Sequence, residues 1–250
     1  MKASISRWGV GWVAVGSVWL GFGCDEGQAV RLPAEVRGRA LVNDPDFSGS
    51  EFNVFACTTC HTTTAADDGG VASTLYGVVD RESWWGGSIA SLSEAVDFCY
   101  VYFMRGFPEL EPTSEDGRAL YEYLASLSSG AALPTRPMTV VEAVYDPTDP
   151  GRDGGGLVGD AAAGADVYER ACAVCHGEKS TGVGRLGPNV VVIPEASEEF
   201  ARDNNVPLRL VLAEKVRHGQ FFGVGGNMPL YPLERMSDEE LADLLEYLAP

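Results

Sequence analysis

Two stretches decide the fold of this 250-residue chain: Cys57-Thr-Thr-Cys60-His61 and Cys172-Ala-Val-Cys175-His176. Each consists of two cysteines three positions apart, with a histidine directly after the second. The copies are offset by 115 positions and hold four of the six cysteines, the others being Cys24 and Cys99. Because the histidine recurs with the cysteines, one chemical role has to account for all three residues in both copies.

Two thiols at this spacing can add to the two vinyl groups of a haem, and the next residue then places its imidazole against the iron. Cys-x-x-Cys-His is the pattern of c-type haem attachment. Zinc explains the pattern less well. The two cysteine pairs of a zinc site usually lie about 15 to 20 residues apart, whereas these lie 115 apart, and a zinc site would leave the repeated histidine unexplained. A thioredoxin-like pair would need a βαβ context, which the sequence does not indicate. We therefore predict two covalently bound haem c groups, attached at Cys57, Cys60, Cys172 and Cys175, with His61 and His176 as iron ligands.

Three short helical patterns recur around each pentapeptide. Apolar residues repeat at helical spacing, and each copy closes on Leu-x-Glu-Tyr-Leu, ending at Leu124 and at Leu248. Ser237-x-x-Glu240 forms a capping box before the last of these helices. The expected helices cover residues 50–56, 91–103 and 114–124 in the first copy, and residues 160–171, 207–219 and 237–248 in the second. The fold class that follows is mainly α.

With these helices around its pentapeptide, each half resembles a class I cytochrome c domain. The resemblance implies two small all-helical domains, at residues 45–127 and 158–250. Residues 128–157, between them, contain four prolines and a Gly-Gly-Gly run, a composition typical of a linker. The resemblance also implies that the carbonyl of Pro188 supports the iron-binding His176.

Each iron needs a second axial ligand, and for the second haem we predict Met228. This residue stands in the loop Gly225-Gly226-Asn227-Met228-Pro229, between the second and the closing helix of its copy. Cytochromes c place their methionine in such a loop, and Met228-Pro229 resembles their usual dipeptide. Ligation by histidine and methionine raises the reduction potential. We expect Met236 to be a core or surface residue at a helix start, and His218 to be a surface residue at a helix end.

The first haem has two candidate ligands, Met104 and Cys99. Met104 precedes a tyrosine of its closing helix by 19 positions, as Met228 does, which favours Met104. Alignment of the preceding helices instead places Met104 inside a helix. The run Cys99-x4-Met104-x-Gly106 also resembles thiosulfate dehydrogenase-like dihaem cytochromes, which implies that Cys99 is the ligand. Positions five apart differ by about 140° around an α-helix, so we expect only one of the two to face the iron. We favour Met104 and keep Cys99 as the alternative.

The N-terminus indicates export. Residues 1–23 carry Lys2 and Arg7 and an apolar stretch of about 15 residues, which is typical of a secretory signal and too short to span a membrane. Leu20-Gly-Phe-Gly-Cys24 resembles a lipoprotein cleavage box, which implies a lipid on Cys24; ordinary cleavage nearby is the alternative. We expect a protein that is periplasmic, or anchored on the extracytoplasmic side of a bacterial membrane.

The charge narrows the class of partner. With 36 acidic and 18 basic residues, the formal net charge is −18. Nucleic acid is excluded as a partner, since a phosphate backbone needs Lys and Arg. A redox protein with a basic docking surface would complement this charge.

The paired units favour an electron carrier over an enzyme, because the sequence offers no acid–base or nucleophile constellation. Two alternatives stay open. One is a dihaem enzyme that oxidises thiosulfate or a related sulfur compound, and the other is a haem-bearing subunit of a larger oxidoreductase.

Overall fold

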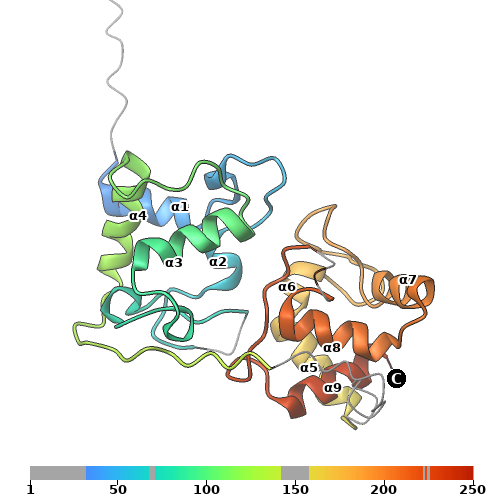
Figure 1. Ribbon diagram of the computed structural model, residues 1–250. Coiled ribbons are helices and arrows are strands. Elements are labelled where there is room, and N and C mark those ends of the chain that lie inside the picture. Colours follow the sequence, from blue (N-terminus) through green and yellow to red (C-terminus); the bar gives the residue numbers. More distant parts are fainter. Residues whose placement is uncertain (1–31, 68–70, 142–157, 222, 224–225, 250) are drawn as a thin grey trace, which may run out of the picture. The chain divides into compact units, whose positions relative to one another are not determined.

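The computed structural model describes residues 32–67, 71–141, 158–221, 223 and 226–249 (Figure 1). The predicted signal segment with Cys24, Gly225 and residues 142–157 of the predicted linker lie outside the described residues. We call residues 32–141 the first segment and residues 158–249 the second segment. Within the described residues the chain forms helices and isolated bridges but no strand. The prediction of a mainly α fold is confirmed.

The first segment is built on α1 (Ala34–Val42), which packs against α4 (Glu115–Ser126). Helices α2 (Cys57–Cys60) and α3 (Leu92–Phe98) lie between them in sequence, and a π-helical turn at Cys99–Phe103 extends α3. Short 3₁₀ turns occur at Pro45–Ser48, Val78–Asp80 and Trp85–Gly87. Ser91 and Ser114, where the sequence predicts these helices to begin, cap α3 and α4 by accepting backbone hydrogen bonds. The buried core of this segment consists of Val42, Val78, Leu110, Leu120, Tyr123 and Leu124.

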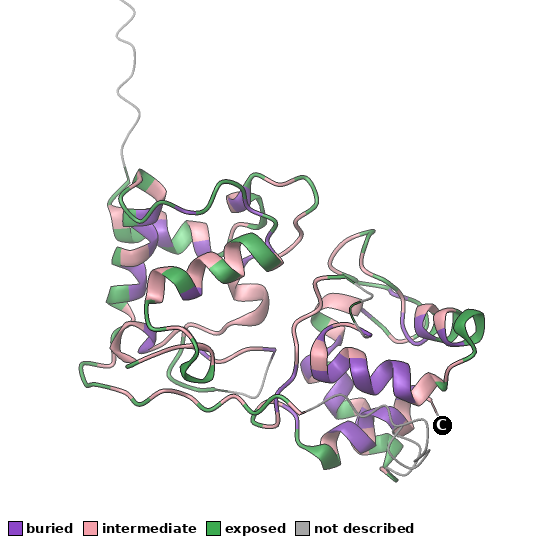
Figure 2. Cartoon of the chain, viewed as in Figure 1, coloured by how far each residue is buried: buried purple, intermediate pink, exposed green. Residues whose placement is uncertain are grey.

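The second segment contains α5 (Ala161–Ala171), α6 (Ala173–His176), α7 (Glu195–Asn204), α8 (Leu208–His218) and α9 (Asp238–Leu248). Helix α5 packs against α9, and α8 contacts both α7 and α9. The Ser237–Glu240 capping box is present, and Gly219 ends α8 in the left-handed conformation. Figure 2 shows the buried faces of α5, α8 and α9. Their core includes Val167, Leu212, Val216, Met236, Leu241, Leu244 and Leu245. Helix α7 was not predicted.

A glycine lets the first and last helices of each segment approach closely. A Cβ atom at Gly38 in α1 would lie 2.0 Å from the carbonyl oxygen of Ala119 in α4. A Cβ atom at Gly164 in α5 would lie 2.0 Å from the carbonyl oxygen of Asp243 in α9. The two segments therefore share one helix-pair geometry, although their sequences differ around it.

Gly164→Ala should destabilise the protein, even though alanine is the better helix former by about 1 kcal/mol. The added methyl group has to push α5 away from α9, and overpacking of this kind costs about 1–3 kcal/mol. Gly38→Ala should act in the same way between α1 and α4. Thermal and urea denaturation measure both effects; a midpoint equal to or above the wild-type value would contradict the close helix contact.

The helix predicted over residues 50–56 is wrong. The Asn53 side chain donates to the carbonyls of Pro45 and Phe55, and it accepts from the backbone N–H of Phe55. Such local side-chain bonds compete with helical ones, so this stretch is irregular. The counterpart of α5 is α1, which lies before the predicted domain start at residue 45.

The described part of the predicted linker, residues 128–141, pairs with an earlier stretch of the first segment. Residues 128–141 contain no helix, as expected, but Leu133 pairs with Arg81 in an isolated bridge. Its N–H donates to the carbonyl of Asp80, and its carbonyl accepts from Glu82. Among the described residues, no helix is both long and apolar enough to cross a membrane.

Candidate functional site

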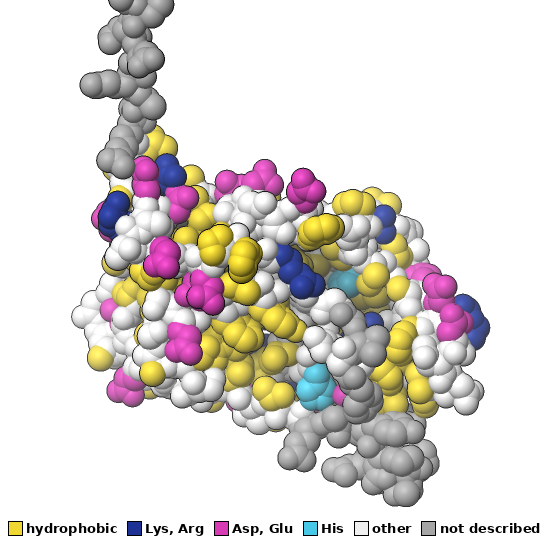
Figure 3. Space-filling view, turned by 45° about the horizontal axis from the view of Figure 1, so that its top comes forward, with side chains coloured by type: hydrophobic (Ala, Val, Ile, Leu, Met, Phe, Trp, Pro, Cys, Tyr) yellow, Lys and Arg dark blue, Asp and Glu magenta, His cyan; other side chains and the backbone are white. Residues whose placement is uncertain are grey.

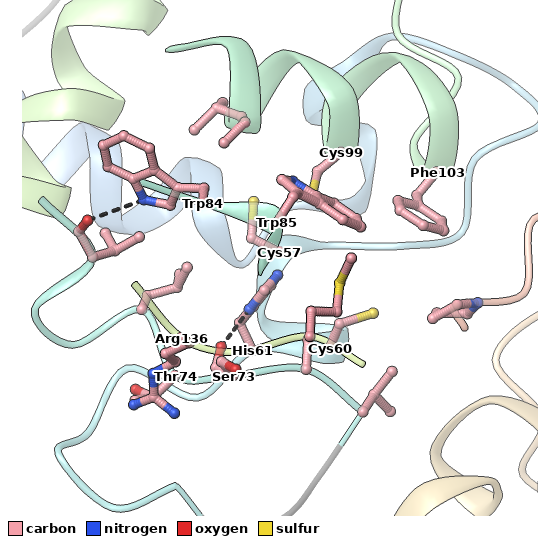
Figure 4. Close-up of a pocket in the computed structure, with 18 of the residues that line it drawn as sticks. Cys57, Cys60, His61, Ser73, Thr74, Trp84, Trp85, Cys99, Phe103 and Arg136 are labelled. Carbon is pink, nitrogen blue, oxygen red and sulfur yellow. Dashed lines mark hydrogen bonds between the residues drawn. The ribbon is translucent and has the colours of Figure 1, made fainter. Parts of the chain in front are cut away.

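A cavity of about 370 Å³ borders the first pentapeptide. Figure 4 shows His61 on one side of the opening and the helix that carries Cys99 and Phe103 on the other. Most of the remaining lining is apolar and includes Val42, Phe47, Leu75, Val78, Trp84, Leu92, Val96, Leu120 and Leu124. A cavity with apolar walls and a few polar groups suits a largely hydrophobic ligand.

His61 is held in one orientation. Its Nδ1 lies 2.6 Å from the carbonyl oxygen of Ser73, so Nδ1 carries the hydrogen and donates it. Burial lowers the pKa of His61 and thus favours the neutral ring. The unprotonated Nε2 is then available as a metal ligand.

The five cysteines among the described residues are free thiols. Burial raises the pKa of Cys57 and of Cys175 to about 11, and that of Cys99 and of Cys172 to about 12. A reactive redox cysteine usually has a lowered pKa. These thiols are therefore poor candidates for a thioredoxin-like pair. Among the described residues, no three His, Cys, Asp or Glu side chains group together to hold a metal ion by themselves.

The π-helical turn changes the geometry expected for Cys99 and Met104. The N–H of Met104 donates to the carbonyl of Cys99 at 3.1 Å, an i to i+5 bond. This wider turn brings residues five apart closer to the same side of the helix, and both residues line the cavity. The expectation that only one of the two faces the iron assumed regular α-helical spacing, which does not hold at this turn. It stays a prediction.

Three arginines also border the cavity: Arg81, Arg136 and Arg235. Asp67 forms ion pairs with Arg136 and Arg235. Arg81 donates from Nη2 to the carbonyl of Thr74 at 2.9 Å, while its buried Nε has no hydrogen-bond partner among the described residues. Burial, and to a lesser extent Arg136, lowers the pKa of Arg81 to about 10. An unused buried donor among guanidinium groups suits an anionic group of a ligand.

The second pentapeptide has a similarly oriented histidine. The Nδ1 of His176 lies 2.9 Å from the carbonyl oxygen of Val191, and burial lowers the pKa of its ring. The expected partner, Pro188, is not the acceptor. Pro188 lies inside a turn that the bond from Val190 N–H to the carbonyl of Gly187 closes, and the acceptor is Val191, directly after this turn.

Met228 follows α8 and packs against the core that contains Cys172. Gly219 makes this possible, because a Cβ atom there would lie 2.2 Å from the carbonyl oxygen of Met228. For Met236 the sequence left a core or a surface position open, and the structure places this residue fully buried in the core. His218 is half-buried rather than a surface residue: its Nδ1 lies 2.9 Å from Glu214 and its Nε2 lies 2.6 Å from the carbonyl of Val141.

Residues 159–248 match the model of the family described as cytochrome C oxidase, cbb3-type, subunit III. These residues form a cytochrome c-type domain. The domain contains the second pentapeptide and Met228, and it implies covalently bound haem c. The first pentapeptide, Cys99 and Met104 lie outside the matched range.

Among solved structures, the as-isolated form of thiosulfate dehydrogenase (TsdBA) from Marichromatium purpuratum is similar, with 19% sequence identity and a TM-score of 0.41. The similarity covers 86% of this chain and 45% of that chain, so this chain spans less than half the length of that protein. A comparison with curated protein sequences found no match.

The residues around the cytochrome c domain's pentapeptide fit haem c, since a fixed imidazole lies beside two thiols and an apolar core. The first segment fits it as well. There, Arg81 and Arg136 would bind the carboxylates of a haem, and one of these carboxylates would accept a hydrogen bond from the unused Nε donor of Arg81. Sequence reasoning missed both arginines, because isolated arginines outside a motif carry no signal that they share a cavity.

Proposed function

We propose that this chain is a dihaem c-type cytochrome that transfers electrons in an extracytoplasmic redox chain. One observation carries the proposal: both pentapeptide histidines donate Nδ1–H to a backbone carbonyl farther along the chain, at Ser73 and at Val191. Each ring is thereby fixed with Nε2 available. The arrangement outside the matched family range thus repeats the one inside it.

Bound haem supplies an iron that takes up and releases one electron. The chain's own residues attach, orient and enclose it. Cys57 and Cys60 fix its position, and Ser73 holds the ring of His61. The apolar walls exclude water, and solvent exposure is one of the factors that set a haem potential.

The intact mass of the mature protein tests this proposal. The mass should exceed that of the polypeptide by two haem groups, and the pyridine spectrum should give two haem c per chain. One haem per chain would reject the dihaem assignment. The same mass locates the mature N-terminus, which we propose follows the signal segment 1–23. It also decides whether Cys24 carries a lipid that anchors the protein to the membrane.

We also propose a docking surface for a basic redox protein beside the first cavity. Trp85 borders the cavity, and its ring centroid lies 4.6 Å from that of Phe98. Phe98 and Tyr102 are exposed and stack on each other. Figure 3 shows apolar patches with acidic side chains beside them on one face of the molecule. We call Trp85, Phe98, Tyr102 and Phe103 the aromatic patch. Trp85 and Phe103 line the cavity, and Phe98 and Tyr102 are exposed at the surface.

An acidic cluster begins beside the aromatic patch, since Asp97 directly precedes Phe98. The Asp97 carboxylate accepts a hydrogen bond from the backbone N–H of Leu110 at 3.2 Å, and Glu109 and Glu111 flank Leu110. Burial raises the pKa of Asp97, this hydrogen bond lowers it, and the negative charges of Glu109 and Glu111 raise it. A basic partner would relieve this repulsion. Charge complementarity of this kind mainly increases association rates and makes them sensitive to salt.

Neutralising the acidic cluster with Asp97→Asn, Glu109→Gln and Glu111→Gln should slow electron transfer to a basic mono-haem cytochrome c by about tenfold at low salt. The rate should also depend less on ionic strength. Stopped-flow mixing measures both. The matched control neutralises Glu195, Glu198 and Glu199 on α7, which removes the same charge elsewhere. Equal slowing in the two triple variants would point to net charge rather than to this surface.

A second candidate function is the oxidation of thiosulfate or a related sulfur compound. The observation that favours it is that Cys99 lines the same cavity as His61, so that a thiolate could be the second ligand there. A third candidate is a haem-bearing subunit of a larger oxidoreductase, because the matched family is described as a subunit of an oxidase. Co-purification of a larger complex from the native membrane or periplasm would distinguish it.

A further inference from the structure

Asn227 links the loop that carries Met228 to the π-helical turn at Cys99 and Met104, so it connects the stretches that carry the candidate sulfur ligands. It directly precedes Met228, in the loop between α8 and α9. Its side-chain Nδ2 donates to the carbonyl of Tyr102 at 2.6 Å and lies 3.5 Å from that of Phe103. Its Oδ1 accepts from Nη2 of Arg105 at 2.5 Å. One amide therefore contacts three residues at the end of the π-helical turn of the first segment, Tyr102, Phe103 and Arg105, which flank Met104.

The contacted carbonyls need such a partner. The last carbonyls of a helix have no intrahelical donor, and here the helix ends at Phe103. Pro108, which would be the i+5 donor for Phe103, has no N–H. Asn227 thus caps the C-terminal end of the turn from another part of the chain.

The backbone at this end is unusual. Arg105 has a φ of 57°, in the left-handed region that a non-glycine residue seldom adopts. The contact of its guanidinium with Asn227 helps to hold it there. Gln220, from the same loop as Asn227, adds a 2.8 Å bond to the Tyr102 hydroxyl. The turn is thus fixed by the loop of Met228, in addition to its own internal bonds.

We infer that Asn227 is a positioning residue that sets how the π-helical turn presents Cys99 and Met104 to the first cavity. The inference rests on the proposed function, because it takes these sulfur atoms as candidate iron ligands. It makes the ligand geometry of the first site depend on the loop that carries Met228. A change in the conformation of the Met228 loop should therefore alter the conformation of the π-helical turn, and the reverse.

Asn227→Ala removes every bond that the Asn227 side chain makes to this turn, and Asn227→Asp removes the donor while keeping the shape. Both variants should loosen the turn. Amide hydrogen exchange should become at least tenfold faster in peptides covering residues 99–106, where Met104 and Gly106 donate to Cys99 and Tyr100. The EPR signal of the first haem, identified as the one altered by Cys99→Ala or Met104→Leu, should split into more than one species.

Asn204→Ala is the matched control, since Asn204 also donates to a backbone carbonyl, that of Phe200, but within α7. It should change neither readout. Exchange and EPR signal in both Asn227 variants equal to those of Asn204→Ala would overturn the inference. Haem content is measured first: a wild-type protein without haem in the first segment would reject the proposed function, while the exchange rates still decide whether Asn227 fixes the turn.

Discussion

Replacing Cys57 and Cys60 together by serine should lower the covalently bound haem from two groups per chain to one. Replacing Cys172 and Cys175 should have the same effect at the other site. A serine hydroxyl does not add to a vinyl group as a thiol does, so each double variant loses one covalent attachment. Intact mass under denaturing conditions measures this directly, because haem that is not covalently bound dissociates.

Cys99→Ala is the control for these double variants. Cys99 has no second cysteine at the required spacing, so this variant should retain both haem groups. Loss of both haems from either double variant would contradict independent attachment at the two pentapeptides. Full haem content in the Cys57/Cys60 variant would show that the first pentapeptide is not an attachment site.

The parts of the fold that the sequence predicts are those that local chemistry determines. The serine caps of α3, α4 and α9 follow from the need of the first helical N–H groups for an acceptor. Gly219 ends α8 because glycine adopts the left-handed conformation without a steric penalty. The pairing of each pentapeptide with a closing helix depends on apolar spacing, which is also visible in the sequence.

The missed features depend on contacts between distant residues. The counterpart of α5 is α1, whose position before the pentapeptide differs because Asn53 organises an irregular stretch in the first segment. The π-helical turn depends on i to i+5 backbone bonding, such as the bond from Met104 N–H to the carbonyl of Cys99, and no residue pattern predicts it. Arg81 and Arg136 come from separate stretches of chain and share a cavity only in the folded protein. Tertiary packing, rather than local propensity, decides each of these features.

Met104→Leu should remove the methionine-type charge-transfer band of one haem from the near-infrared spectrum of the oxidised protein, while Cys99→Ala leaves both bands in place. Both residues line the cavity, but a haem bound through His61 would offer one further ligand position, so only one of the two sulfur atoms would bind. Met104 is the more completely buried of the two. Leucine fills a similar volume without a donor atom, so folding should be little affected. The potential of the first haem should fall by on the order of 0.1 V, within the roughly 0.8 V that axial ligands span.

The opposite pattern would assign the ligand to Cys99. In that case the oxidised wild-type protein has a thiolate EPR signature at one haem, which Cys99→Ala abolishes and Met104→Leu leaves unchanged. Burial raises the pKa of Cys99 to about 12, so the neutral thiol is favoured and a thiolate there needs the iron to stabilise it. A thiolate ligand would also lower the potential of the first haem below that of a methionine-ligated second haem. Electrons from a sulfur substrate would then pass from the first haem to the second, and thiosulfate oxidation becomes the activity to measure.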